Sequence, residues 1–238
     1  MPTTRSRSNS RRPRRPRQLA LDFRPWGGAR AGAGRPNKSG RKSVSHRTRE
    51  TLPHRFPVHV TLRLRDDLPS LRNQALFADI RRALRSGRER FGFRLNHFAV
   101  QSNHMHLIVE ATGRPALSRG MQGLGVRLAK AINARLRRAG KVFSDRYHDE
   151  ILRCPKHVRN VIVYVLKNAQ HHGVFQAGFD PYTSGAWFDG WRNAGSELGV
   201  EAPNESSPVV PPRTWLLVTG WRRHGLIPVQ TLPQFRPR

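Results

Sequence analysis

The chain has 238 residues, 37% of them apolar, and its 44 Lys and Arg outnumber its 15 Asp and Glu to give a formal net charge of +29. Because a compact chain with this charge repels itself, the composition favours a polyanionic partner, most readily nucleic acid. The one cysteine, Cys154, excludes a disulfide within the chain and a zinc site built from thiolates. Apolar stretches are too short to span a membrane and no apolar segment follows the basic N-terminus, so we expect a cytoplasmic protein.

Residues 1–50 differ in composition from the rest, being rich in Arg, Gly, Ser and Pro. Such a segment buries too little apolar surface to offset the entropy of ordering it, so we expect a disordered basic tail. Its Gly34-Arg35-Pro36 triplet resembles the core of an AT-hook, in which an extended Arg enters the minor groove. The leading Arg of that motif is absent, so Arg35 is a DNA-binding candidate beside the simpler interpretation of a flexible basic linker.

The first half of the remaining chain shows strand and helix periodicities in turn. Apolar and polar residues alternate over residues 56–65, which predicts a half-buried strand. A helix opening at Pro69 follows and ends near Gly87. Two strands at 93–101 and 104–110, joined by only two residues, then predict a hairpin.

The second half continues with two helices and a strand. Apolar residues at a spacing of three and four from Leu117 onward predict a long helix that Gly140 ends as a cap. Residues 142–153 predict a fourth strand, and Pro155 starts a helix that runs to about Gln170. The order strand, helix, strand, strand, helix, strand predicts an α+β fold with a ferredoxin-like antiparallel sheet, two helices on one face and an additional C-terminal helix.

These patterns divide the chain into four parts. After the tail comes one domain, residues 51–175, followed by a loop or linker over residues 176–212 that becomes rich in Pro and Ser. Residues 213–238 form a C-terminal tail that contains Trp215 and Trp221. Two tryptophans in a short tail usually anchor it onto the body of a protein, and the alternative is stacking on nucleic-acid bases.

The triplet His104-Met105-His106 lies within a predicted strand. Side chains at positions i and i+2 of a strand point to the same face, with their Cα atoms about 7 Å apart. Two imidazoles at that separation suit a single metal ion. The alternative is a pair of ordinary surface histidines, because a triplet of this kind is common on its own.

The last predicted helix places Tyr164 and Asn168 one turn apart, on a flank of its apolar face. A tyrosine there is either a packed aromatic residue with a hydrated hydroxyl or a nucleophile, and Asn168 is a candidate third metal ligand. Among the other tyrosines, Tyr147 is the second choice for a nucleophile and Tyr182, in a loop, is the last.

Two segments carry a resemblance to a known family. Residues 98–110 read FAVQSNHMHLIVE, and residues 140–173 read GKVFSDRYHDEILRCPKHVRNVIVYVLKNAQHHG. Both resemble the single-tyrosine HUH transposases, particularly the REP-associated tyrosine transposase branch, and the resemblance covers residues 56–173. Ser102 replaces a frequent proline, and Asn168 follows the REP-associated branch where many insertion-sequence members carry the longer Gln.

The resemblance implies a transposase that cleaves and rejoins single-stranded DNA through a 5′-phosphotyrosine intermediate. His104, His106 and Asn168 would hold Mg²⁺ or Mn²⁺, and Tyr164 would attack the phosphorus. Because the pKa of a tyrosine is ordinarily near 10, the metal or a cation such as Lys167 or His171 would assist it. Single-stranded or hairpin DNA is the implied partner. Insertion-sequence members act as dimers and the REP-associated branch includes monomers, so a homodimer is left open.

Further charged residues have a functional and a plain interpretation. Basic residues of the long helix are candidate phosphate contacts or an ordinary charged helix face; they are Arg127, Lys130, Arg135, Arg137 and Arg138. Acidic residues near the fourth strand are extra metal ligands or a solvated cluster; they are Asp145, Asp149 and Glu150. Two other functions compete with a transposase: a basic nucleic-acid-binding protein without catalysis, and an HUH nickase of replication or plasmid transfer, which usually carries further domains.

Overall fold

A computed structural model of the chain describes residues 49–168, 179–192 and 206–229. The predictions for the basic tail up to residue 48, including Arg35, lie outside the described residues, and so does His171. The last turn predicted for the helix that begins at Pro155 also lies partly outside them.

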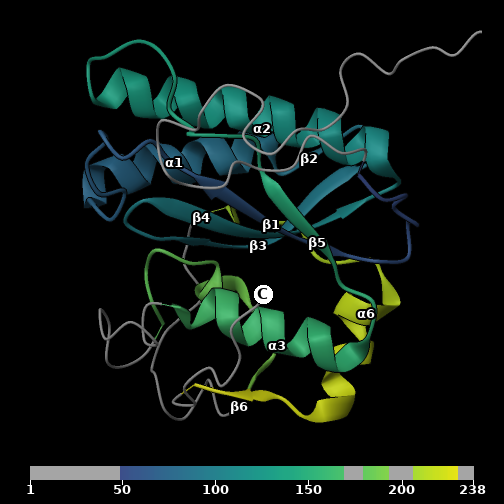
Figure 1. Cartoon of the computed structure of the whole chain (residues 1–238). Helices are drawn as coiled ribbons and strands as arrows, with labels where there is room; N and C mark the ends of the chain where they lie inside the picture. Colours follow the sequence, from purple (N-terminus) through teal and green to yellow (C-terminus); the bar gives the residue numbers. More distant parts are fainter. Residues whose placement is uncertain (1–48, 169–178, 193–205, 230–238) are drawn as a thin grey trace, which may run out of the picture. The chain divides into compact units, whose positions relative to one another are not determined.

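Five antiparallel strands form the central sheet, in the order β2-β3-β4-β1-β5 (Figure 1). Their bounds are β1 Val58–Arg63, β2 Glu89–Arg90, β3 Phe93–Val100, β4 His104–Ala111 and β5 His148–Ile151. The predicted hairpin of β3 and β4 is confirmed. β4 pairs on its other side with β1, and this register places Thr61 opposite His106.

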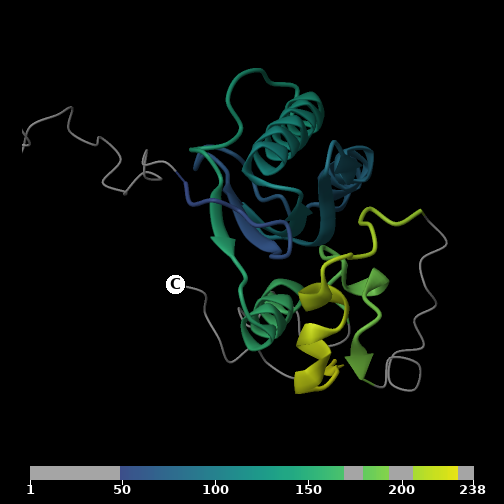
Figure 2. The same ribbon diagram turned by 90° about the vertical axis from the view of Figure 1, so that its right-hand side faces the viewer.

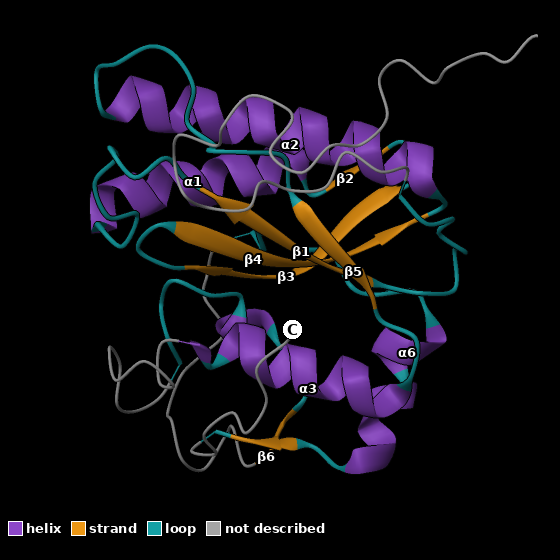
Figure 3. Cartoon of the chain, in the orientation of Figure 1, coloured by secondary structure: helices purple, strands orange, loops and turns teal. Residues whose placement is uncertain are grey.

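Three long helices lie on the two faces of this sheet. Figure 3 shows the helices in purple and the strands in orange. They are α1 Gln74–Gly87, α2 Arg114–Arg135 and α3 Pro155–Leu166. The first two cover one face and α3 lies against the other (Figure 1). The predicted α+β class, with a ferredoxin-like sheet, two helices on one face and an additional helix, is confirmed.

Several predicted boundaries are wrong. The first helix begins at Gln74 instead of Pro69, because the Asn73 side chain accepts a hydrogen bond from the backbone N–H of Leu76 and caps it there. The long helix ends at Arg135, before Gly140. The predicted strand over residues 142–153 shortens to the four residues of β5.

Two apolar cores lie on opposite sides of the sheet. On β4, Met105, Leu107 and Val109 pack into the core beneath α1 and α2. Ile108 packs into the second core together with the apolar face of α3. The alternation along the strand therefore directs His104 and His106 toward the side of α3.

The segments after α3 complete the second core. They include the short elements η1 Gly185–Trp187, β6 Trp191–Arg192, α6 Trp215–Val218, η2 Gly220–His224 and β7 Ile227–Pro228. Figure 2 shows them beside α3, on the same side of the sheet. Trp221 is buried in this core, as expected for a tail that is anchored to the body, whereas Trp215 is 49% exposed.

The interpretation of residues 176–212 as a loop or linker misses how firmly its described parts are attached. Asp180 is buried and forms two hydrogen bonds with the guanidinium of Arg72, at 2.8 and 2.9 Å. Val209 and Val210 are buried as well. Pro and Ser content says nothing about packing against residues that are distant in the sequence.

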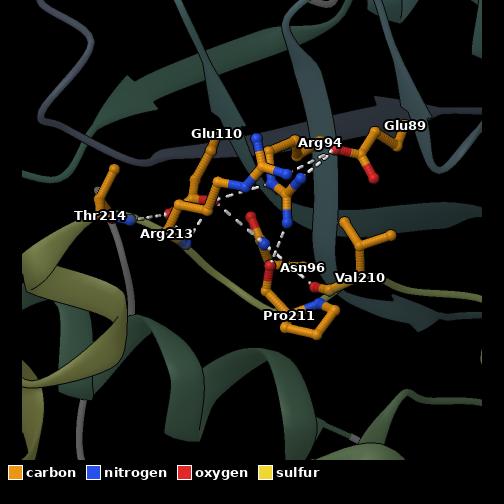
Figure 4. Close-up of polar contacts among 8 residues, drawn as sticks. All are labelled: Glu89, Arg94, Asn96, Glu110, Val210, Pro211, Arg213 and Thr214. Carbon is orange, nitrogen blue, oxygen red and sulfur yellow. Dashed lines mark hydrogen bonds and ion pairs between the residues drawn. The ribbon is translucent and has the colours of Figure 1, made fainter.

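A buried carboxylate attaches the C-terminal segment to β4 (Figure 4). Glu110 accepts hydrogen bonds from the backbone N–H groups of Arg213 and Thr214, at 2.9 and 2.6 Å. The Arg94 guanidinium balances its charge, with 3.5 Å between Nε and the carboxylate. Asn96 bridges Glu110 and the carbonyl of Val210 at 3.3 and 3.2 Å.

No helix in the described parts of the chain is long and apolar enough to cross a membrane.

Candidate active site

Two histidines from β4 form the centre of the candidate site. The Nε2 atoms of His104 and His106 lie 3.0 Å apart, and the two rings are almost perpendicular. His106 is 4% exposed, whereas His104 is partly exposed at the start of the strand. The strand alternation thus produces the convergence of two imidazole nitrogens that the sequence predicted.

Tyr164 reaches this pair from α3. Its hydroxyl oxygen lies 3.4 Å from His106 Nε2, and its ring packs edge-on against the His106 ring at 5.0 Å between centroids. The apolar flank of α3 is buried in the second core, so the helix cannot rotate without exposing it. The sheet and the helix therefore each fix one half of the site.

The opposite nitrogens of the two imidazoles have polar partners. His104 Nδ1 lies 2.8 Å from the amide oxygen of Asn103. His106 Nδ1 lies 3.2 Å from the hydroxyl of Thr61 and 3.1 Å from His59 Nε2. Partners on the Nδ1 side hold both rings with their Nε2 atoms directed toward each other, and Nε2 of His106 also faces the hydroxyl of Tyr164.

Sequence reasoning missed His59, which lies on β1 and is 4% exposed. Its Nδ1 atom lies 3.9 Å from a carboxylate oxygen of Glu150, and the other oxygen of Glu150 lies 3.2 Å from His157 Nε2. The nearby His59 imidazole is the main cause that lowers the pKa of Glu150 below its ordinary value. Only the pairing of β1 with β4 and β5 brings these residues together, and the alternation within β1 alone does not indicate it.

Asn168, the predicted third ligand, is completely buried. Neither atom of its side-chain amide has a hydrogen-bond partner within the described part of the chain. A buried amide without partners is unusual, because removing it from water costs about 1–3 kcal/mol when nothing replaces the lost hydrogen bonds.

Comparison with known proteins identifies the fold and the family. Residues 54–168 match the profile of a family described as IS200-like transposases. A solved structure of a REP-associated tyrosine transposase bound to a REP hairpin is similar in fold, with a TM-score of 0.51 and 15% identity over 71% of this chain and 100% of that one. A search of curated proteins found no match.

Residues 54–168 form a single-tyrosine HUH transposase domain of the IS200-like family. This matched segment contains both histidines of the triplet, Tyr164 and Asn168.

The other two tyrosines of the chain have different surroundings from Tyr164. Tyr147 packs against the core beneath α1 and α2, on the opposite side of the HUH domain's sheet, with the Arg49 guanidinium 3.8 Å above its ring. Burial raises the pKa of its hydroxyl above the ordinary value, which disfavours the phenolate. The Tyr182 hydroxyl donates a hydrogen bond to the carbonyl of Arg72 at 3.1 Å. Neither arrangement suits a nucleophile.

Lys167, which the sequence predicted to assist Tyr164, forms a hydrogen bond with the C-terminal segment. Its ammonium group donates a hydrogen bond to the carbonyl oxygen of Pro228 at 2.5 Å, in β7. The side chain is buried, and this burial lowers its pKa to about 8. Lys167 thus ties α3 to the C-terminal segment.

Two of the three acidic candidates near β5, Asp149 and Glu150, have partners within the protein. Asp149 forms ion pairs with Arg49, at 3.0 Å, and with Arg114. Glu150 contacts His59 and His157 as described above. Among the described residues, no three His, Cys, Asp or Glu side chains lie close enough together to hold a metal. The structure therefore gives these carboxylates paired roles in place of the solvated cluster that the sequence indicated.

The basic candidates of α2 lie across the sheet from the HUH histidines. Arg127 and Lys130 line a surface depression of about 500 Å³ together with Arg119. Arg137 is exposed just after the helix, and Arg138 donates a hydrogen bond to the carbonyl of Lys141 at 3.2 Å. Arg135 forms an ion pair with Asp79 of α1 at 2.5 Å. Contact of these residues with DNA stays a prediction.

Proposed function

We propose that the chain is a transposase that cleaves and rejoins single-stranded DNA, in a metal-dependent reaction that passes through a 5′-phosphotyrosine. The convergence of His104 Nε2, His106 Nε2 and the Tyr164 hydroxyl carries this proposal. A phenol beside two imidazole lone pairs joins a nucleophile to a metal-binding pair, within a domain of the HUH transposase family.

In the proposed reaction, the oxygen of Tyr164 forms a bond to the scissile phosphorus while the bond from phosphorus to the 3′ oxygen breaks. The phenol loses its proton and the departing oxygen gains one, which leaves a phosphotyrosine ester and a 3′-hydroxyl. Because the ester is a phosphodiester like the bond that was cut, another 3′-hydroxyl can attack it and restore a DNA strand.

The residues of the site fit a divalent metal ion. His104 and His106 would hold it through Nε2, and the buried amide of Asn168, which lacks a hydrogen-bond partner among the described residues, would be its third protein ligand. The ion would polarise the phosphate and take up charge that develops during the reaction. Two imidazoles favour Mn²⁺ over Mg²⁺, which prefers oxygen ligands.

Charge and structural similarity support single-stranded or hairpin DNA as the substrate. The chain carries a formal net charge of +29, and the similar REP-associated transposase was solved with a REP hairpin. The depression lined by Arg127 and Lys130 lies across the sheet from Tyr164. The phosphates that it would contact therefore lie beyond the cleavage point. A homodimer stays a prediction from the family resemblance.

The test uses the full chain, Mn²⁺ and labelled single-stranded oligonucleotides taken from the DNA that flanks the gene. Tyr164→Phe should abolish formation of a covalent protein–DNA adduct, because it removes the attacking oxygen. Tyr147→Phe is the matched control and should form the adduct as the wild type does.

Three outcomes would contradict the proposal. An adduct that persists in Tyr164→Phe would show that Tyr164 is not the nucleophile. DNA binding by the wild type without cleavage in Mg²⁺ or Mn²⁺ would favour a non-catalytic binding protein. Cleavage without rejoining when a second 3′-hydroxyl is supplied would favour a nickase.

A further inference from the structure

We propose that His59 and Glu150 are positioning residues that hold His106 in the tautomer with its proton on Nδ1, so that Nε2 is available to a metal. The inference rests on the proposed function, since it concerns how the same site binds its ion. A line of polar groups runs across three strands, from Glu150 on β5 through His59 on β1 to His106 on β4.

The carboxylate at one end gives this line a direction. His59 Nδ1 lies 3.9 Å from the carboxylate of Glu150, and the negative charge favours the proton of the neutral ring on that nitrogen. A neutral imidazole has one protonated nitrogen, which leaves His59 Nε2 as an acceptor. At 3.1 Å, this acceptor draws the proton of His106 onto Nδ1 and leaves a lone pair on its Nε2.

The second neighbour of His106 does not decide the tautomer. The hydroxyl of Thr61, 3.2 Å from His106 Nδ1, can either donate or accept a hydrogen bond. If it donated, His106 would carry its proton on Nε2, which faces Nε2 of His104 and could not bind a metal. His59 Nε2, as an acceptor, therefore selects the tautomer of His106, which the hydroxyl of Thr61 alone cannot do.

His104 obtains the same orientation by a simpler route. The amide oxygen of Asn103 faces its Nδ1 at 2.8 Å, which places the proton on Nδ1 and the lone pair on Nε2. Both imidazoles of the HUH pair are therefore set to present lone pairs toward one point. The difference is that the partner of His106 is buried and depends on strands β1 and β5.

Glu150 also connects this line to the helix of the nucleophile. Its second oxygen lies 3.2 Å from Nε2 of His157, which belongs to the first turn of α3. Tyr164 lies two turns further along that helix. One carboxylate thus bears both on the orientation of His106 and on the attachment of α3 to the sheet.

Loss of partners of this kind usually weakens metal binding by about 10–100-fold. We expect His59→Leu to weaken Mn²⁺ binding by a factor in this range, because the buried acceptor that faces His106 Nδ1 is then lost. His59→Gln should restore much of the affinity, because its amide oxygen can accept the proton of His106. Glu150→Gln should weaken binding, because a carboxamide can donate as well as accept.

The experiment combines two readouts on the full chain. Nitrogen-15 NMR of the imidazoles in the metal-free protein, at about pH 8 where histidines are ordinarily neutral, reports the tautomer of His106 directly. Titration with Mn²⁺ followed by electron paramagnetic resonance reports the affinity. The control is His157→Gln, which removes an imidazole from the same carboxylate without touching His106.

We expect His106 protonated on Nδ1 in the wild type, a mixture of tautomers in His59→Leu and Glu150→Gln, and the wild-type pattern in His157→Gln. His106 protonated on Nε2 in the wild type would overturn the proposal, and so would unchanged Mn²⁺ affinity in His59→Leu. If His59→Leu fails to fold, Glu150→Gln at the half-exposed edge strand decides. None of these readouts requires DNA cleavage, so an inactive protein with the expected tautomer would refute only the proposed function.

Discussion

Buried histidines differ here according to what faces their ring nitrogens. His106 has polar partners on both sides of its ring, whereas Nδ1 of His97, on β3, has none within the described residues. Burial lowers the pKa of His97 to about 4, from an ordinary value of 6.5. The ring of His106 is therefore oriented by polar partners, whereas burial keeps the ring of His97 neutral.

His97 should make the fold sensitive to acid. Its pKa is lower in the folded than in the unfolded chain, so the unfolded chain takes up the proton first as the pH falls. Its contribution to the free energy of unfolding is full above about pH 6.5 and is lost progressively down to about pH 4, by about 3 kcal/mol in all. His97→Gln cannot titrate, so it should lose that much less stability over this range. Urea unfolding of both proteins at the two ends of the range measures the difference; equal losses would contradict the burial of a neutral His97.

At this scale the sequence was informative about residues that share one element. The parity of His104 and His106 follows from the strand period, and the flank shared by Tyr164 and Asn168 follows from the helix period. His59 was missed because its role depends on the strand register, which places Thr61 opposite His106 and His59 opposite Glu150. No local pattern encodes that register.

Among the secondary-structure elements, α2 and β3 approach each other closely. Gly120 of α2 lies against the buried ring of Phe93 on β3, where an added Cβ would lie 2.2 Å from the ring carbon Cγ. At Gly125, one and a half turns further on, the nearest neighbour of an added Cβ would be Phe143 at an ordinary 3.9 Å. Alanine at Gly125 therefore tests helix propensity alone, whereas alanine at Gly120 also tests the packing of α2 on β3.

Gly120→Ala should destabilise the fold, by about 2 kcal/mol, because overpacking exceeds the gain of about 1 kcal/mol in helix propensity. Gly125→Ala, the matched control, should stabilise it by about 0.5–1 kcal/mol. Thermal and urea unfolding of the two variants measure both effects. Stabilisation by Gly120→Ala would show that α2 does not pack on β3 as closely as described.

The four longer strands and three long helices of residues 56–170 were predictable in order and type, but their ends were less so and the short elements were not predicted. The first helix begins after Asn73 and not at Pro69, because the Asn73 side chain accepts a hydrogen bond from the backbone N–H of Leu76. The strand before α3 is short because only four residues pair with β1.

For the whole molecule, the C-terminal segments could not be placed from the sequence. They cover the face of α3 that the sheet leaves open, with Leu217, Trp221 and Ile227 buried there. Glu110 holds the start of this segment through backbone N–H groups, which any residue type would supply. The two tryptophans of residues 213–238 indicated that this tail is anchored to the body, but they did not indicate which core it completes.

The proposed site depends on this assembly, because His104 and His106, the proposed metal ligands, come from the sheet and Tyr164, the proposed nucleophile, comes from α3. The most direct test is mass spectrometry of the protein digested after reaction with a single-stranded oligonucleotide in Mn²⁺. The proposed function predicts a nucleotide attached through its 5′-phosphate to Tyr164, and a free 3′-hydroxyl on the released strand. A nucleotide on Tyr147 or Tyr182, or a 3′-phosphate on the released strand, would contradict it.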